Sequence, residues 1–199
     1  MFQTLLSPEV REIITFCPVR IRYNSPVVLS YTFLCLGLYL INHFIFPHFT
    51  EGFLTNYPGI EWKNPLWYWR LLGHGLGHSN PPHLLGNFSL ILLLGPMLEE
   101  KYGSKPLLSM ILITIMCTGL LNCLFFSTGL LGASGVVFCF ITLASFTNIK
   151  PQEIPLTFVL VALLFLSKEI LGIFKTDQVS QFAHILGGIA GGVFGYFRR

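Results

Sequence analysis

Apolar residues form long uninterrupted runs along this 199-residue chain, instead of alternating with polar ones. A helix needs about 20 apolar residues to cross the hydrocarbon core of a bilayer. Six runs have helical character, over residues 27–46, 82–98, 106–126, 134–148, 154–166 and 179–197, and the fifth reaches 174 if its helix tilts. The pattern predicts an all-α membrane protein with six transmembrane helices, of which the fourth is short for a full crossing.

The composition supports this fold class. Hydrophobic residues make up 53% of the sequence and charged residues 11%, whereas a soluble domain has roughly 25% charged residues. We therefore expect an integral, multi-pass membrane protein in contact with the lipid bilayer. The net charge of +3 and the lack of a basic run give no indication of nucleic-acid binding.

Six spans place both chain termini on one side of the membrane, and the basic residues indicate which side. Eight of the 12 Lys and Arg residues would lie with the termini and four on the opposite side. The positive-inside rule then makes the N-terminal segment, residues 1–26, cytoplasmic. One membrane domain over residues 27–199 would follow, with a long first extracytoplasmic loop at 47–82. That loop contains residue types that favour the membrane–water interface, namely Trp62, Trp67, Tyr68 and Trp69.

Two polar residues interrupt the apolar runs at similar depths. Ser134 starts the fourth span within Gly132-Ala133-Ser134-Gly135, and His184 lies about five residues into the sixth. An ionisable side chain inside a span is costly and is a functional candidate. The alternative is a serine that lets helices pack closely and a histidine bonded to a neighbouring helix. Because the two residues can meet near the extracytoplasmic side, we interpret them as a nucleophile and its base.

Small residues recur every four positions in the sixth span, at Ala183, Gly187, Gly191 and Gly195. Such a stripe lets two helix backbones approach closely in lipid. His184 stands beside the first residue of the stripe, which can therefore press the imidazole against a neighbouring helix.

His83 and Asn87, near the start of the second span, are four residues apart and share one helical face. Together with the backbone N–H of Ser134, they could donate hydrogen bonds to a developing oxyanion. The same spacing fits hydrogen bonds that hold a helix bundle together, and it does not separate the two roles.

Three histidines, His74, His78 and His83, raise the question of a zinc site. Glycines interrupt the helix that would align the first two, and no His-Glu-x-x-His motif is present. We expect no metal and no cofactor.

Several motifs occur together in a fixed order: Trp69-Arg70, His78, His83-x-x-x-Asn87, Gly95, Glu99, Gly103, Gly132-x-Ser134-Gly135 and Ala183-His184-x-x-Gly187-x-x-x-Gly191. Over residues 67–195 this joint pattern resembles the rhomboid intramembrane serine proteases, in their bacterial six-helix form. The resemblance implies that Ser134 is the nucleophile, His184 the general base, and His83 and Asn87 the oxyanion-hole side chains. It implies supporting positions at Gly132, Trp69, Arg70, Glu99, Gly187 and Gly191.

One position departs from the family pattern. Rhomboid proteases commonly have a tyrosine one helical turn after the serine, stacked on the histidine ring. Here that position is Phe138, which keeps the aromatic ring and lacks the hydroxyl group.

The resemblance also implies a substrate and a location. The substrate would be a transmembrane protein cut in its spanning helix near the extracytoplasmic face, and the location a bacterial plasma (inner) membrane. Asp177 is the only aspartate, and its seven-residue separation from His184 is roughly 10 Å along a helix. We therefore expect a Ser-His dyad without a third member.

Two alternatives remain at this stage. A catalytically silent rhomboid-like protein would bind transmembrane helices without cutting them. A small transporter would use His184, His83 and Asn87 as a polar pathway, although the sequence lacks the internal repeat typical of transporters.

Overall fold

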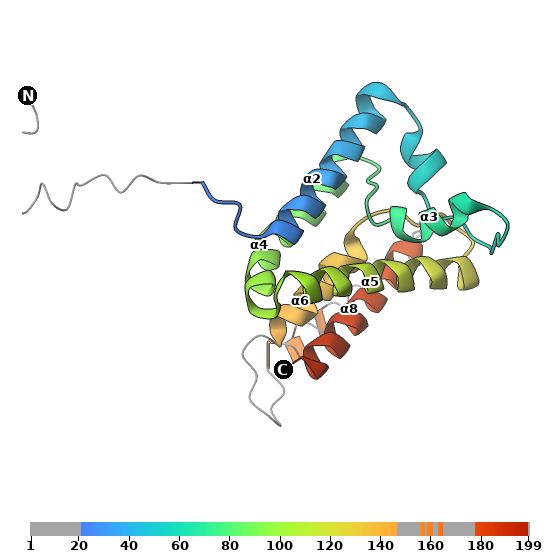
Figure 1. Cartoon of the computed structure of the whole chain (residues 1–199). Coiled ribbons are helices and arrows are strands. Elements are labelled where there is room, and N and C mark those ends of the chain that lie inside the picture. Colours follow the sequence, from blue (N-terminus) through green and yellow to red (C-terminus); the bar gives the residue numbers. More distant parts are fainter. Residues whose placement is uncertain (1–20, 147–155, 158, 161–162, 165–177, 199) are drawn as a thin grey trace, which may run out of the picture.

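The computed structural model describes residues 21–146, 156–157, 159–160, 163–164 and 178–198, and within them the chain is mostly helical (Figure 1). The elements are α2 (Pro26–Leu40), which continues as the π-helical turn η1 (Ile41–Ile45), a second π-helical turn η2 (Thr50–Leu54), α3 (Pro65–Gly73), α4 (Pro81–Tyr102), α5 (Ser104–Phe125), α6 (Ser134–Ser145) and α8 (Gln178–Phe197). The predicted helical character is confirmed. Within these ranges, extended backbone forms one isolated β-bridge, between Asn56 and Leu130.

Three helical stretches of the described chain are long and apolar enough to cross a bilayer: Pro26–Ile45, Pro81–Tyr102 and Ser104–Phe125. Helix α6 is apolar but has only 12 residues, as the short fourth run predicted. Helix α8 has 20 residues and is not one of these three stretches of the described chain. Most of the predicted fifth span, 154–166, lies outside the described residues, so the count of six spans stays a prediction.

The polar residues 99–105 separate the second and third predicted spans, but most of them are helical in the structure. Helix α4 continues to Tyr102, and only Gly103 separates it from α5. Gly103 has a φ of 86°, a conformation that glycine adopts without steric cost. Polar residues are tolerated in this last turn of α4 because their side chains bond the ends of other helices. One of them, Lys101, donates to the carbonyl oxygen of Phe146 at the end of α6, at 3.1 Å.

The predicted long loop, residues 47–82, contains helical structure. The turn η2 and helix α3 both lie within it. Helix α3 begins where Pro65 fixes φ at its first position and the side chain of Asn64 accepts from the N–H of Leu66 at 3.0 Å. The helix ends at Gly73, the first of three closely spaced glycines. The loop is thus a folded unit beside the membrane helices.

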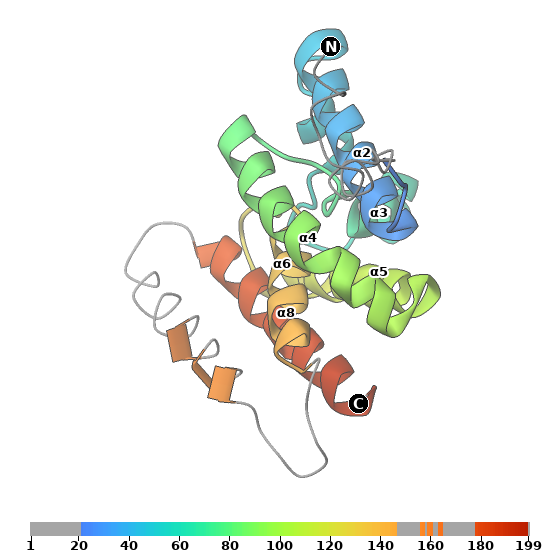
Figure 2. The same cartoon turned by 90° about the vertical axis from the view of Figure 1, so that its left-hand side faces the viewer.

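Helix α6 lies inside the bundle. The apolar and small side chains of its first half, residues 135–140, are all buried. Helix α8 lies along α6 in both views, and α4 and α5 also pack against α6 (Figures 1 and 2). The start of α6, which carries Ser134, is therefore surrounded by three other helices.

Candidate active site

The segment before α6 delivers Ser134 as the first residue of the helix. Ala133 is the N-cap, and the N–H groups of a first helical turn have no acceptor within the helix. They also lie at the positive end of the helix dipole. The half-buried Ser134 therefore combines a hydroxyl group with a backbone N–H at a place that favours negative charge.

His184 faces α6 from the first half of α8. Its ring is stacked on that of Phe138, with centroids 4.1 Å apart and planes inclined by 6°. Phe138 is four residues after Ser134 and therefore on the same side of α6. The neighbours of the two candidate residues also touch, since a Cβ built on Gly135 would lie 3.4 Å from the carbonyl oxygen of Ala183.

The glycine stripe of α8 makes the close contact with α6. A Cβ at Gly187 would overlap the carbonyl oxygen of Gly135, and a Cβ at Gly191 would overlap Thr142 and the carbonyl oxygen of Cys139. Gly195 meets the ring of Phe146 in the same way. The stripe therefore allows the backbones of α6 and α8 to touch beside Ser134 and His184.

His83 and Asn87 lie next to the segment that precedes Ser134. A Cβ on Gly132 would come within 2.6 Å of the imidazole atoms Cε1 and Nε2 of His83 and 3.8 Å from the Asn87 amide nitrogen. Gly132 has a φ of 125°, so both its conformation and its surroundings require glycine. The structure thus brings His83, Asn87 and the start of α6 together.

Each of these two polar residues also has a partner in the preceding loop. The Asn87 amide nitrogen donates to Nε2 of His78 at 3.0 Å. The Nδ1 atom of His83 lies 3.3 Å from the hydroxyl of Ser79, and its Nε2 lies beside Gly132. An amide has two N–H groups, so Asn87 keeps one for a further acceptor.

His78 is a site residue whose role the sequence reasoning missed. Its side chain is fully buried, and burial lowers its pKa to about 4, with the neighbouring His83 as a second cause. His78 is therefore neutral at pH 7 and can accept the bond from Asn87. The sequence pattern included His78 among the matching motifs, but nothing in its spacing identified Asn87 as its partner.

The supporting residue Arg70 holds the long first loop in place. Its guanidinium donates to the carbonyl oxygen of Gly52 and lies over the ring of Tyr57, 5.1 Å from the centroid. Trp69 is 48% exposed, and its indole lies against Gly73, one turn further along α3. Trp69 therefore faces outward from α3, as expected for an aromatic residue at the membrane interface.

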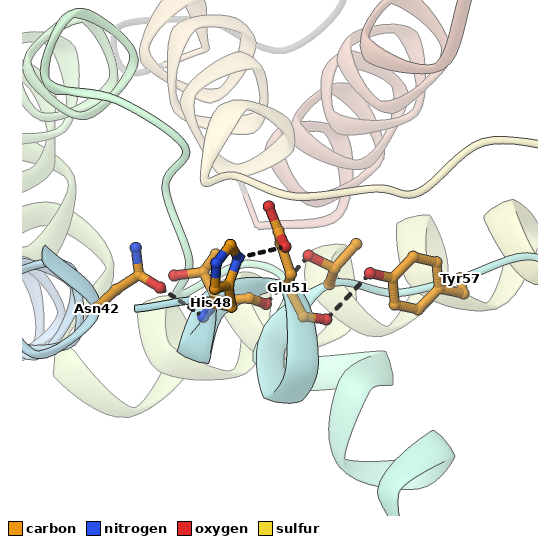
Figure 3. Close-up of polar contacts among 6 residues, drawn as sticks. Asn42, His48, Glu51 and Tyr57 are labelled. Atoms are coloured by element: carbon orange, nitrogen blue, oxygen red, sulfur yellow. Dashed lines mark hydrogen bonds and ion pairs between the residues drawn. The ribbon is translucent and has the colours of Figure 1, made fainter. Parts of the chain in front are cut away.

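Further polar contacts fix the turn η2 of this loop (Figure 3). The side chain of Asn42 accepts from the N–H of Thr50 at 2.8 Å, and His48 pairs with Glu51 at 3.0 Å. The Tyr57 hydroxyl donates to the carbonyl oxygen of Glu51 at 3.1 Å. The loop is therefore anchored on both sides of η2.

Glu99, the supporting residue of α4, is buried and accepts three hydrogen bonds. Its carboxylate accepts from the N–H groups of Val27 and Val28, at 3.0 and 3.1 Å, and from the hydroxyl of Ser104 at 2.7 Å. A carboxylate is favourable at a helix N-terminus, and here it joins the first turns of α2 and α5 to α4.

In the described residues, no group of three or more His, Cys, Asp or Glu side chains is arranged to hold a metal ion. Asp177 lies outside those residues. The candidate site combines a hydroxyl group at the N-terminus of α6, an imidazole on the adjacent helix α8, and amide and imidazole donors on α4. This set is suited to acyl transfer, in which a nucleophile, a base and oxyanion donors are needed together.

Comparison with known proteins finds similar sequences that include a protease. A model of the Rhomboid domain matches residues 66–199. Rhomboid protease GlpG of Haemophilus influenzae is 26% identical over 176 residues, which cover 87% of this chain and 91% of that protein. RHOMBOID-like protein 7 of Arabidopsis thaliana is 28% identical over 135 residues, which cover 64% of this chain and 42% of that protein.

Proposed function

Because this chain belongs to the rhomboid family of integral membrane proteins, we propose that it is an intramembrane serine endopeptidase with a Ser-His dyad. Ser134 attacks the carbonyl carbon of the scissile peptide bond while His184 takes the hydroxyl proton. His184 then returns that proton to the leaving amine, and water hydrolyses the resulting acyl-enzyme by the same route. The observation that carries the proposal is the stack of His184 on Phe138, one turn from Ser134.

The oxyanion of the tetrahedral intermediate would be stabilised by three donors. These are the backbone N–H of Ser134, Nε2 of His83 and the second amide N–H of Asn87. Gly132 supports this role because its missing side chain lets His83 and Asn87 approach the start of α6. A hydrogen-bond donor that already points at the position of the oxyanion contributes most to catalysis when water is excluded around it.

The dyad needs a means to orient the imidazole without a carboxylate. Phe138 contacts one face of the His184 ring, and the glycine contact fixes the helix that carries it. Stacking occupies the ring face, so a ring nitrogen can take the proton of the serine hydroxyl in the ring plane and return it to the leaving amine. Packing thus takes the orienting role that an aspartate has in a triad.

The proposed substrates are membrane proteins with a transmembrane helix, cut near the extracytoplasmic face. The topology that goes with this has both termini in the cytoplasm, residues 1–26 as an N-terminal segment, and residues 27–199 as a six-helix domain in a bacterial plasma membrane. A membrane-impermeant thiol reagent should reach a Ser127→Cys variant from outside the cell only. Labelling of that cysteine from the cytoplasmic side would invert the topology.

The decisive experiment is reaction of the detergent-purified protein with a serine-directed mechanism-based inhibitor, together with cleavage of a model transmembrane substrate. We expect the wild type to react and cleave, and Ser134→Ala and His184→Ala to do neither. Ser145→Ala, at the other end of α6, where the hydroxyl donates to the carbonyl of Ile141, is the matched control and should stay active. A folded wild type that neither reacts nor cleaves would favour the alternative, a catalytically silent rhomboid-like protein.

A further inference from the structure

Asn56 lies in the middle of the long first loop and is completely buried, at 0% exposure. Asparagine is seldom fully buried, and burial of its amide costs free energy unless hydrogen bonds replace those to water. The backbone of Asn56 pairs with that of Leu130 in an antiparallel bridge. Its N–H donates to the Leu130 carbonyl at 3.0 Å, and its carbonyl accepts from the Leu130 N–H at 2.8 Å.

The Asn56 side chain binds the last turns of α5. Its Oδ1 accepts from the Asn122 amide at 3.1 Å, and its own amide nitrogen lies 3.4 Å from the sulfur of Cys123. The Asn122 amide nitrogen also lies 3.3 Å from the carbonyl oxygen of Thr128. One buried residue therefore connects the long loop, the end of α5 and the chain that follows α5.

The chain that follows α5, residues 126–133, leads directly to Ser134. It contains no helix, so its path depends on ties to its surroundings. Besides the bridge at Leu130, the Gly132 N–H donates to the carbonyl oxygen of His74 at 2.8 Å. The nucleophile segment, as we call residues 126–133, is thus held mainly by the long first loop.

The nucleophile segment also contacts α8 beside the candidate base. Leu130 packs with Ala183, which adjoins His184, and the rings of Phe126 and Phe182 are 4.3 Å apart. Displacement of the segment would therefore move Ser134 and disturb the packing of His184 together.

We propose that Asn56 is a positioning residue that sets the register of the nucleophile segment and so the geometry between Ser134, His184 and the oxyanion donors. The inference rests on the proposed serine-protease function and extends it to the long loop. Removal of the Asn56 amide leaves the buried amide of Asn122 without its side-chain acceptor and detaches the long loop, which is bridged to the segment at Leu130, from the end of α5. Small displacements of a nucleophile are costly, with losses on the order of 10²-fold for about 1 Å.

The test compares Asn56→Ala with a matched control, Asn64→Ala. Asn64 lies in the same loop and caps α3, so its loss destabilises the loop without reaching the nucleophile segment. Two readouts are measured in one detergent: the rate of Ser134 labelling by the mechanism-based inhibitor, and amide hydrogen exchange in peptides that cover residues 126–133. Steady-state cleavage of a model substrate separates kcat from KM.

We expect Asn56→Ala to slow labelling and lower kcat by roughly 10- to 100-fold, with KM within about twofold, and to speed exchange in residues 126–133. Asn64→Ala should lower the thermal midpoint but leave labelling and this exchange unchanged. If Asn56→Ala does not fold, Asn122→Ala removes the same network from the α5 side and carries the same expectation.

Unchanged exchange in a folded Asn56→Ala protein, or faster exchange with wild-type labelling, overturns the inference. A folded wild type that does not label at all removes the serine-protease proposal instead. In that case the exchange rates of residues 126–133 still decide whether Asn56 holds the nucleophile segment.

Discussion

The ring of Phe138 lies face to face with the imidazole of His184, 4.1 Å between centroids and nearly parallel at 6°. The two rings belong to helices that the glycine stripe brings into backbone contact. The stack therefore depends on two levels of structure, the aromatic pair itself and the close approach of α6 and α8.

Phe138→Leu keeps the apolar volume at this position and removes the flat surface against His184. We expect kcat to fall by about tenfold, because the imidazole loses its fixed orientation. Phe138→Tyr keeps the stack and should retain kcat within about threefold. Phe140→Leu is the control, since Phe140 is buried on the same helix, and it should lower the thermal midpoint with kcat maintained. Equal loss of kcat in both leucine variants would show that the stack has no special role.

Gly187→Ala should separate α6 from α8, since the added Cβ would overlap the backbone carbonyl of Gly135. We expect turnover to fall on the order of 10²-fold and the thermal midpoint to drop. Gly192→Ala is the matched control, because a Cβ there meets nothing within 4 Å. It should leave turnover unchanged and add up to about 1 kcal/mol of stability, as alanine favours the helix. Equal behaviour of the two variants would contradict the close helix contact.

Gly132→Ala should damage catalysis more than folding. Its Cβ would lie 2.6 Å from the His83 ring, at a backbone φ of 125°. Displacement of an oxyanion donor costs about 10²- to 10³-fold in kcat. Gly59→Ala has a comparable backbone strain, at φ 90°, but open space around the Cβ, so kcat should stay within about threefold. Cleavage kinetics of both variants, with thermal midpoints, separate the clash from the strain.

The sequence predicted the described helices well because apolar runs leave a strong local signal. It also singled out the candidate site residues, whose roles stay predictions. Apolar runs mark α2, α4 and α5, and the small-residue stripe marks the face of α8 that contacts α6. The roles of His78 and Asn56 could not be predicted, because each depends on a hydrogen bond to a residue distant in sequence or across a loop. Glu99 illustrates the same limit: it lay just beyond the predicted second span, 82–98, and its three hydrogen bonds to other helix ends explain why it lies inside α4.

Glu99→Gln should destabilise the fold, since an amide replaces one of two carboxylate oxygens that accept from α2 and α5. Hydrogen bonds to a charged group contribute about 1.5–3 kcal/mol, so the free energy of unfolding should fall by a similar amount. Glu100→Gln is the neighbouring control; Glu100 is exposed, and the change should stay within about 0.5 kcal/mol. Denaturation of both variants in one detergent provides the comparison. A silent Glu99→Gln would mean that the joint between α2, α4 and α5 contributes little.

Acid should destabilise the protein before the carboxylates are protonated. Burial lowers the pKa of both His74 and His78 to about 4, compared with about 6.5 in an unfolded chain. Between these values the unfolded state binds protons that the folded state does not, so stability is full above pH 6.5 and is lost as the pH falls toward 4. The thermal midpoint should therefore drop between pH 7 and pH 5. His48→Gln, at an exposed histidine, should show the same drop, and a midpoint independent of pH would contradict the buried neutral rings.

The tie between Lys101 and the end of α6 fixes how deep the serine lies. Twelve residues rise about 18 Å, while the hydrocarbon core is about 30 Å thick. An upright α6 whose last residue lies at the level where α4 ends therefore places its first residue, Ser134, roughly 12 Å short of the opposite surface. One residue inserted into α6 would lift Ser134 by about 1.5 Å and rotate it by about 100° away from His184. Only an insertion of about one whole turn returns Ser134 to the side of α6 that faces His184. The depth of cleavage in a substrate helix can therefore change in steps of about 5.4 Å and not continuously.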